Sequence, residues 1–283
     1  MPRPGITEIS LAAPAYREGA GIRAVVERWM EYLSGRFARG RYEVVVCNDG
    51  SDDDTGEVLA SLQARFPALK VVTHAKNQGA AAALATAIAH TTRDWVLLVD
   101  SDGQFPVENL ERFEEAWTEP PPQAFLGVRM GKKDSPFSRF GSWSSGQLCN
   151  AFHGAHYRDF NSAFKLVRGD LLRSLTLEAK GLNYSTEITS KLLERGVPLV
   201  EVPVSHVPRE TGTSSMRALR GATHRFLFVS YVGMRQLLLS TGVLREPGQV
   251  PLADARPGGR RTGKNGASRR ADPKGRGQRT RAS

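Results

Sequence analysis

The sequence predicts an α/β fold with a mixed, mostly parallel sheet and helices on both of its faces. Between Ile9 and Trp117, short apolar runs alternate four times with segments whose apolar residues recur at helical spacing, a pattern typical of a parallel sheet with crossover helices. The apolar runs lack strict polar–apolar alternation, which indicates strands covered on both faces. Each run ends in a polar loop, so these loops are expected at one edge of the sheet.

The first two strand and helix pairs occupy the N-terminal quarter of the chain. A strand over Ile9–Ala13 is followed by a helix from Ala20 to about Phe37, in which apolar residues recur at spacings of three and four. The second strand, Tyr42–Cys47, leads into a turn rich in Asn, Asp and Gly. The helix after this turn carries its apolar residues on one side and ends near Phe66.

The next two pairs complete the regular half of the chain. A strand over Lys70–His74 precedes an alanine-rich helix over Ala80–His90, whose small side chains allow a close approach to the sheet. A strand over Trp95–Val99 precedes a helix over Val107–Trp117. The loops that follow the four strands are expected to converge on one crevice. They are Tyr16–Glu18, Asp49–Asp53, Lys76–Gly79 and Asp100–Gln104.

The second half of the chain is less regular. Strands are expected over Ala124–Gly127, Asp159–Val167 and Val197–Val204, and helices over Phe140–Phe152 and Glu187–Arg195. A long amphipathic segment then runs to about Leu244. We therefore divide the chain into an α/β domain over residues 1–215, an amphipathic helical segment over 216–246 and a basic tail over 247–283, which is expected to be disordered.

Charge and composition limit the classes of function. The formal net charge is +10, but residues 251–283 hold ten Arg or Lys and two Asp, a net +8. The rest of the chain carries only +2, so we expect no specific nucleic-acid partner. Cys47 and Cys149 lack metal-like spacing, and no signal peptide is evident, which indicates a cytoplasmic protein. The apolar stretch Phe226–Leu239 is too short and too polar for a membrane span.

Two aspartates mark the end of the fourth predicted strand. Asp100 and Asp102 are separated by Ser101, and Gln104 follows two residues later. Such oxygen donors suit Mg²⁺ or Mn²⁺ bound together with a diphosphate. Alone, the pattern is more often only a polar turn that closes a strand, so the flanking residues must decide. No Gly-x-Gly-x-x-Gly or Gly-Lys-Ser/Thr motif accompanies it, which counts against dehydrogenases and P-loop proteins.

The motifs together resemble those of the family 2 glycosyltransferases, which have the Rossmann-like GT-A fold, and among them the polyprenyl-phosphate sugar transferases. The order and spacing of the motifs carry this resemblance over roughly Ile9–Ser215. The motifs are Pro14-Ala15-Tyr16 with Glu18, Asn48-Asp49-Gly50-Ser51 with Asp53 and Thr55, Asn77 with Gly79, Asp100-Ser101-Asp102 with Gln104, Asp159–Lys165, and Glu201–Val204 leading to Arg209 and Gly212-Thr213-Ser214.

The resemblance implies an inverting transfer of a sugar from a nucleotide diphosphate sugar to an acceptor, which in this subgroup is a polyprenyl phosphate. It also implies that Asp100, Asp102 and Gln104 hold Mg²⁺ or Mn²⁺ on the diphosphate. The residues implied around the nucleotide sugar are Pro14, Tyr16, Glu18, Asp49, Gly79, Asp100 and Ser101.

The class of acceptor decides which further residues the reaction needs. A hydroxyl acceptor requires a general base, for which Asp159 and Glu187 are the candidates. A lipid phosphate is already ionised and requires cations instead, for which Arg129, Arg139 and Arg209 are the candidates. Asp102 is a predicted catalytic residue with either acceptor, because the resemblance implies that it holds the metal.

Other functions stay open at this point. A family 2 transferase acting on a saccharide hydroxyl is one alternative. A sugar-nucleotide nucleotidyltransferase is less favoured, because the Gly-rich triphosphate loop is missing. A non-enzymatic RNA- or membrane-binding protein would depend on the tail, so deleting residues 247–283 would test it. A lipid acceptor would place the protein at the inner face of the membrane, where Phe226–Leu239 either lies on the lipid or packs on the domain. The oligomeric state is undetermined.

Overall fold

A seven-stranded mixed sheet forms the centre of the structure. The computed structural model describes residues 5–130, 136–179, 183–207 and 218–244. The chain divides into two units, Met1–Val250 and Pro251–Ser283, and all described residues belong to the first. The strand order is β3-β2-β1-β4-β6-β5-β7. The strands are β1 (Ile9–Ala15), β2 (Tyr42–Asn48), β3 (Leu69–Thr73), β4 (Trp95–Leu98), β5 (Ala124–Met130), β6 (Lys165–Arg168) and β7 (Val200–Ser205).

Only β6 among these strands runs against its neighbours. It pairs in antiparallel fashion with β4 and β5, whereas the pairs β1–β2, β1–β4, β2–β3 and β5–β7 are parallel. The predicted mixed, mostly parallel sheet is therefore confirmed. The helices are α1 (Gly19–Arg36), α2 (Thr55–Arg65), α3 (Ala80–Ala89), the 3₁₀ turn η1 (Val107–Asn109), α4 (Leu110–Glu115), α5 (Pro136–His153), α6 (Gly169–Arg173), α7 (Tyr184–Glu194) and α8 (Ala218–Ser240).

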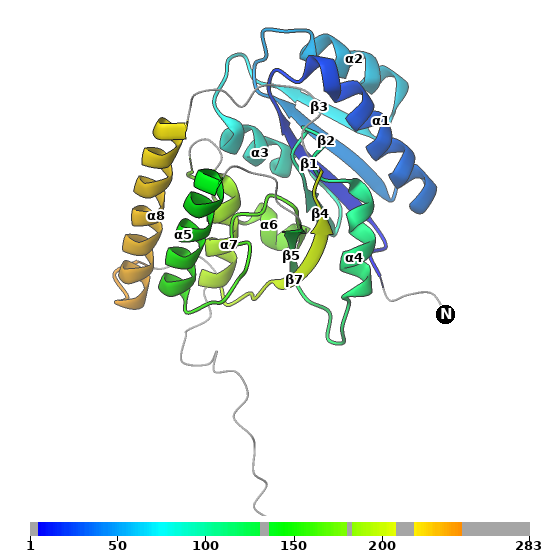
Figure 1. Ribbon diagram of the computed structural model, residues 1–283. Helices are drawn as coiled ribbons and strands as arrows, with labels where there is room; N and C mark the ends of the chain where they lie inside the picture. Colours follow the sequence, from blue (N-terminus) through cyan, green and yellow to red (C-terminus); the bar gives the residue numbers. More distant parts are fainter. Residues whose placement is uncertain (1–4, 131–135, 180–182, 208–217, 245–283) are drawn as a thin grey trace, which may run out of the picture. The chain divides into compact units, whose positions relative to one another are not determined.

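Helices cover both faces of the sheet, as the sequence predicts. Successive strand residues point to opposite faces, so Val44 and Val46 pack with α1, α2 and α4, whereas Val45 and Cys47 pack with α3, α6 and α7. Figure 1 shows α1, α2 and α4 on one side of the strands and α3, α6 and α7 on the other. Because both faces are buried, the strands are apolar without alternation.

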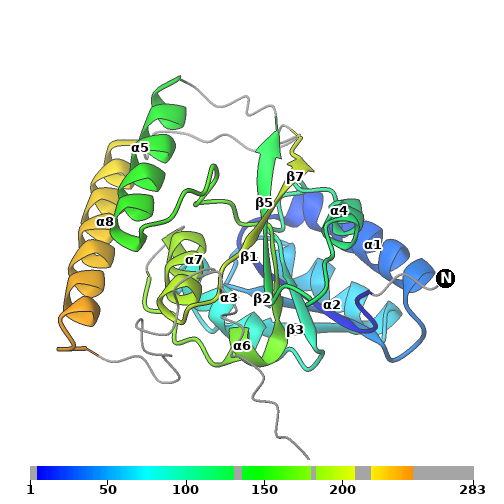
Figure 2. The ribbon, with the colours of Figure 1, turned by 90° about the horizontal axis from the view of Figure 1, so that it is seen from below.

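Helices α5 and α8 form a further layer outside α7. They lie side by side in both views (Figures 1 and 2). Their contact is a small apolar cluster of Cys149, Phe160, Val229 and Val232. The amphipathic segment predicted to follow residue 216 therefore forms a helix that packs on other helices and does not join the sheet.

The strand predicted over Asp159–Val167 is much shorter in the structure, where β6 begins at Lys165. The residues before it form a turn, in which the N–H of Ser162 donates to the carbonyl of Asp159 at 3.0 Å. The amide of Asn161 donates to Ser145 and accepts from Thr186. Side-chain hydrogen bonds thus replace a sheet ladder here, which the apolar pattern alone did not indicate.

Gly50 offers a test of how tightly the turn after β2 is packed. Its φ is +62°, and a Cβ placed there would lie 2.5 Å from the backbone carbonyl carbon of Lys76. Gly40 has a φ of +81°, and a Cβ placed there would meet nothing within 4 Å. We expect Gly40→Ala to lower the free energy of unfolding by about 1 kcal/mol, for backbone strain alone. Gly50→Ala should lower the free energy of unfolding by roughly 3 kcal/mol, because the backbone of Lys76 must also move.

Urea unfolding of both variants would measure the difference, provided that the denaturant dependence stays unchanged. Equal losses at the two positions would contradict the close approach of the Lys76 backbone to Gly50.

Candidate active site

The loops after β1 and β2 are joined by hydrogen bonds at the carboxyl ends of the strands. The N–H of Glu18 donates to Thr55 Oγ1 at 2.9 Å, and the N–H of Arg17 donates to Ser51 Oγ at 3.1 Å. Asp53 accepts from the N–H of Gly19 and from Thr55. The predicted meeting of these loops is therefore confirmed, and it depends on the Ser, Asp and Thr side chains of the turn after β2.

The carboxylate of Asp49 ties the third loop to the same edge. Asp49 is 1% exposed. Its Oδ1 lies 2.8 Å from His74 Nδ1 and accepts from the N–H of Gln78 at 2.9 Å, while its Oδ2 accepts from the N–H of Gly79 at 2.7 Å. Gly79 has a φ of +96° and immediately precedes α3. The negative charge therefore lies at the N-terminus of α3, where the helix dipole also favours it.

Three other residues expected around the nucleotide lie at the carboxyl end of β1. They are Pro14, Tyr16 and Glu18. Pro14 belongs to β1, opposite Cys47 of β2. Tyr16 follows the strand with 37% of its surface exposed, and the Arg17 guanidinium lies 5.2 Å from its ring centroid. Glu18 directly precedes α1. Tyr16 thus offers an exposed aromatic ring beside a cation at the strand ends.

Asp100 and Asp102 follow β4, and a tyrosine from a distant helix reaches the first of them. Tyr184, the first residue of α7, donates its hydroxyl proton to Asp100 Oδ1. Burial and the nearby charge of Asp102 raise the pKa of Asp100 to about 6, although the Tyr184 hydrogen bond opposes the rise. Asp102 Oδ1 accepts from the N–H of Gln104 at 3.0 Å, and Ser101 between the two aspartates is buried.

The loop after β4 is also connected to the end of β7. The N–H of Val207 donates to the carbonyl of Gln104 at 2.9 Å, and the Gln104 side-chain amide lies 3.4 Å from the carbonyl of Val207. The His206 ring packs edge-on against Phe105, with 4.9 Å between centroids. Arg209 comes two residues after Val207 and lies outside the described residues.

Arg129 and Asp159, proposed above for different roles, form a pair. Arg129 Nε lies 2.8 Å from Asp159 Oδ2 and its Nη2 lies 2.9 Å from Oδ1, while its backbone N–H also donates to Oδ2. The side chain of Asp159 is 3% exposed and that of Arg129 18%. A bidentate arginine holds a carboxylate in its ionised form and occupies both of its oxygens.

Lys165 is a buried cation that the sequence reasoning did not select. Its ammonium group donates to the carbonyl of Ser162 and to Ser185 Oγ at 2.7 Å. Burial lowers its pKa to about 7, with Asp159 and Asp100 opposing the fall and Arg129 adding to it. A lysine inside the apolar run Phe164–Val167 was the available signal. Tyr184 gave no comparable signal, because it lies 84 residues from Asp100 along the chain.

Glu187, the second candidate base, holds the segment before α7. Its oxygens accept from the backbone N–H groups of Glu178 at 2.7 Å and Ala179 at 2.8 Å, and Lys191 Nζ lies 2.9 Å away. Glu187 is 1% exposed. Arg139 lies in α5, but its side chain is outside the part of the structure that is described.

The donor set at the end of β4 fits a hard divalent cation. Among the described residues, no group of three His, Cys, Asp or Glu side chains converges to hold a metal. Asp100, Asp102 and Gln104 would therefore supply at most a partial set of ligands, as is usual for Mg²⁺ bound through one or two carboxylates and a substrate diphosphate. Burial and the neighbouring charge of Asp102 raise the pKa of Asp100, and a bound cation would oppose both effects.

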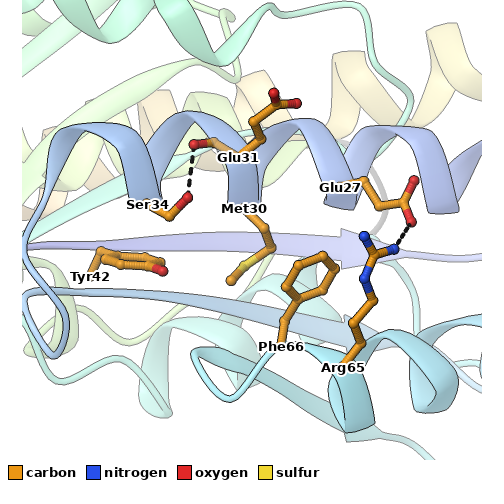
Figure 3. Close-up of a pocket in the computed structure, with 7 residues that line it drawn as sticks. All are labelled: Glu27, Met30, Glu31, Ser34, Tyr42, Arg65 and Phe66. Atoms are coloured by element: carbon orange, nitrogen blue, oxygen red, sulfur yellow. Dashed lines mark hydrogen bonds and ion pairs between the residues drawn. The ribbon is translucent and has the colours of Figure 1, made fainter.

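A surface pocket of about 380 Å³ lies elsewhere, between α1 and α2 beside the start of β2. Figure 3 shows that Met30, Tyr42 and Phe66 form its apolar part, while Glu27 and Arg65 form an ion pair of 2.6 Å at one end. Because Tyr42 begins β2, this pocket is at the opposite end of the strand from Asp49. It contains none of the predicted site residues.

The chain resembles proteins of one family in sequence. The family model described as Glycosyl transferase family 2 matches residues 10–174. A dolichyl-phosphate beta-glucosyltransferase of Trichomonas vaginalis is 28% identical over 109 residues, which are 38% of this chain and 32% of that protein. An undecaprenyl-phosphate 4-deoxy-4-formamido-L-arabinose transferase of Klebsiella pneumoniae is 24% identical over 219 residues, which are 77% of this chain and 65% of that protein. The chain therefore spans between a third and two thirds of these relatives.

Solved structures share the fold. The glucosyl-3-phosphoglycerate synthase of Mycobacterium tuberculosis, solved with Mn²⁺, UDP-glucose and phosphoglyceric acid, aligns with a TM-score of 0.62 and 19% identity. The alignment covers 81% of this chain and 79% of that one. The mannosyl-3-phosphoglycerate synthase of Rubrobacter xylanophilus gives a TM-score of 0.61 at 18% identity, over 87% of this chain and 79% of that one. The sheet and its helices thus have the GT-A arrangement.

The contact between Tyr184 and Asp100 predicts how Mn²⁺ binding depends on pH. Mn²⁺ needs the ionised carboxylate, so affinity should rise as pH increases through about 6, the pKa of Asp100, and then level off. Tyr184→Phe removes a hydrogen bond that lowers this pKa, so the midpoint should move to higher pH. Electron paramagnetic resonance of Mn²⁺ with UDP present, from pH 5 to 8, would measure both midpoints.

Tyr231→Phe is the matched control, because the Tyr231 hydroxyl also donates to a carboxylate, that of Glu178 at 2.8 Å. Its midpoint should equal that of the wild type. If Tyr184→Phe had the same midpoint as the wild type, the Tyr184 hydroxyl would have no influence on the ionisation of Asp100.

Proposed function

The chain belongs to glycosyl transferase family 2, and from this premise we propose that it transfers a sugar, with inversion, from a nucleotide diphosphate sugar to a polyprenyl phosphate. The names of its relatives support the acceptor, since they include a dolichyl-phosphate and an undecaprenyl-phosphate sugar transferase. The observation that carries the proposal is the pairing of Asp159 with Arg129. This pair occupies a candidate base, and an acceptor that is already ionised needs no base.

The donor would bind along the ends of β1, β2 and β4. Tyr16 presents an exposed ring for the base, and Pro14 and Glu18 border it. Asp49 would act through the loop that it holds, since its oxygens accept from Gln78 and Gly79. Ser101 would lie under the diphosphate, between the two aspartates.

The diphosphate would be held beside Asp100, Asp102 and Gln104 together with Mg²⁺ or Mn²⁺. When bound, the ion supplies charge neutralisation for the departing nucleoside diphosphate. Tyr184 keeps the Asp100 carboxylate in position through its hydrogen bond. Lys165, whose pKa burial lowers to about 7, adds a positive charge near Asp100 and Asp159 when it is protonated, and this charge stabilises both carboxylates.

An ionised acceptor explains why the candidate bases are already occupied. Asp159 receives a bidentate arginine, and Glu187 accepts two backbone N–H groups and pairs with Lys191. The oxygens of both carboxylates are therefore already engaged by hydrogen bonds and ion pairs. A phosphate oxygen can attack the anomeric carbon without losing a proton. The new C–O bond forms as the bond to the nucleoside diphosphate breaks, and that leaving group keeps the electron pair.

Cations must then hold the acceptor phosphate. We assign this role to Arg129, Arg139 and Arg209. The guanidinium groups of Arg139 and Arg209 suit bidentate contacts with phosphate, whereas Arg129, whose Nε and Nη2 already contact Asp159, would contribute its positive charge. Arg129 is kept in place by Asp159 at the end of β5. A saccharide hydroxyl as acceptor is less favoured, because it needs a base that neither Asp159 nor Glu187 readily supplies. With a lipid acceptor, the protein would act at the inner, cytoplasmic face of a membrane.

A transfer assay would test this function directly. Labelled UDP-, GDP- and dTDP-sugars are offered with a short polyprenyl phosphate in detergent and with Mn²⁺ or Mg²⁺. We expect metal-dependent labelling of the lipid from one donor, and Asp102→Asn should lower the rate roughly 100-fold or more, because a charge that holds the metal is lost. Asp170→Asn is the control, since Asp170 is 72% exposed on α6.

Parallel reactions with the unphosphorylated polyprenol and with simple saccharides would separate the acceptor classes. Labelling of a hydroxyl acceptor but not of the polyprenyl phosphate would refute the proposed acceptor. Equal activity of Asp102→Asn and the wild type would refute the proposed metal site.

A further inference from the structure

In the part of α8 whose side chains are described, residues 228–240, the one charged residue faces the protein. Arg235 is the only Asp, Glu, Lys or Arg between positions 228 and 244 of the sequence. Its Nε lies 3.0 Å from Glu194 Oε2 of α7, with side chains 14% and 0% exposed. The Tyr231 hydroxyl donates to Glu178 at 2.8 Å. These contacts fix which side of α8 faces the rest of the molecule.

The outward side of α8 carries no charge among the described residues. Met234 and Leu237 are each 58% exposed there, beside Ser230 and Ser240. The Tyr231 ring lies at the edge of this side and is 39% exposed. Val243, just beyond the helix, is 71% exposed. A helix at a water-facing surface normally has the reverse arrangement, with its charges outside and its apolar residues inside.

Helix α5 has the same character beside it. Leu148 and Phe152, which are four residues apart and therefore on one side of the helix, are 45% and 38% exposed. The sequence from position 140 to 157 contains no Asp, Glu, Lys or Arg, although such residues make up 24% of the chain. The two helices touch closely, since a Cβ added to Gly233 of α8 would lie 2.6 Å from the Phe152 ring.

We call five exposed apolar side chains of these two helices the α5/α8 face. They are Leu148, Phe152, Tyr231, Met234 and Leu237. Figure 2 shows the two helices together at the outside of the described structure. Exposed apolar side chains gathered on two neighbouring helices are typical of an interaction site.

Charge along the sequence indicates what covers the face. Lys132 and Lys133 precede α5, and Arg220 and Arg225 lie in the first half of α8. Residues 251–283 add a net charge of +8. Uncharged apolar helix faces combined with basic residues in the sequence are typical of segments that lie on an anionic bilayer. No helix within the described residues has both the length and the apolar character needed to cross a membrane.

We propose that the α5/α8 face docks the protein onto the surface of an anionic lipid bilayer. This inference rests on the proposed function, because a polyprenyl phosphate acceptor is delivered from such a surface. The chain connects the face to the proposed acceptor site, since Arg129 precedes α5 and its partner Asp159 follows it. Docking through α5 would therefore keep Arg129 and Asp159, which flank this helix in the chain, near the lipid.

The test is sedimentation of the full chain with vesicles of phosphatidylcholine containing phosphatidylglycerol. We expect the wild type to bind, and the double variant Met234→Glu/Leu237→Glu to bind about tenfold more weakly or worse, since two charges enter the apolar face. The control is Ala24→Glu/Ala64→Glu, which makes the same change of net charge at exposed positions of α1 and α2. It should bind nearly as well as the wild type. UDP and Mn²⁺ binding establishes that each variant is folded.

A second measurement identifies the surface in contact with lipid. Leu237 is 58% exposed on α8, and Ala24 is exposed on α1. Brominated lipids should quench the fluorescence of the tryptophan added by Leu237→Trp, but not that of the tryptophan added by Ala24→Trp. Equal losses of binding in both double variants would show that net charge alone acts and would overturn the proposal, as would unchanged binding of Met234→Glu/Leu237→Glu.

Gel filtration tests the alternative, that a second copy of the chain covers the α5/α8 face. A wild-type dimer that Met234→Glu/Leu237→Glu converts to a monomer, with no vesicle binding, would overturn the proposal. Vesicle binding without transfer to polyprenyl phosphate would refute the proposed function and leave the docking face standing. Transfer in detergent without vesicle binding would support the proposed function and refute the docking face.

Discussion

The carboxylate of Asp49 lies inside the molecule, where an ionised group is stable only if donors surround it. His74 and the N–H groups of Gln78 and Gly79 provide those contacts. The turn after β2, the end of β3 and the start of α3 must therefore stay together. Gly50 permits the required close approach of the Lys76 backbone. The edge of the sheet at which we place the donor is built around this one buried charge.

A second set of charges organises the region between β4 and α7. Asp100 is held by Tyr184, Asp159 by Arg129, and Lys165 adds a positive charge that influences both carboxylates. Each buried charge has a neighbour of opposite sign or a hydrogen bond, which keeps the cluster stable and fixed in position. Such an arrangement suits a reaction in which negative charge develops on a leaving group and an ionised acceptor enters. It suits proton abstraction from a hydroxyl poorly.

The orientation of α8 connects this chemistry to a surface. The pair between Arg235 and Glu194 is enclosed by protein, and Met234 and Leu237 face outwards as a result. In water, that arrangement exposes apolar area at a cost in free energy. On a bilayer, the same residues would be buried and the basic residues of the chain would lie near anionic headgroups. The acceptor that we propose is found in the same place.

The sequence by itself determined the alternation of strands and helices, the mostly parallel sheet and the family, because these follow from local periodicity and from motifs in a fixed order. It also placed Asp100 and Asp102 at a strand end. Only the tertiary structure decided that Arg129 pairs with Asp159, that Tyr184 reaches Asp100, and that residues 158–161 form a turn. The two side-chain contacts join residues 30 or 84 positions apart. Local patterns carry no information about them, since side-chain pairing across the fold depends on how the elements pack.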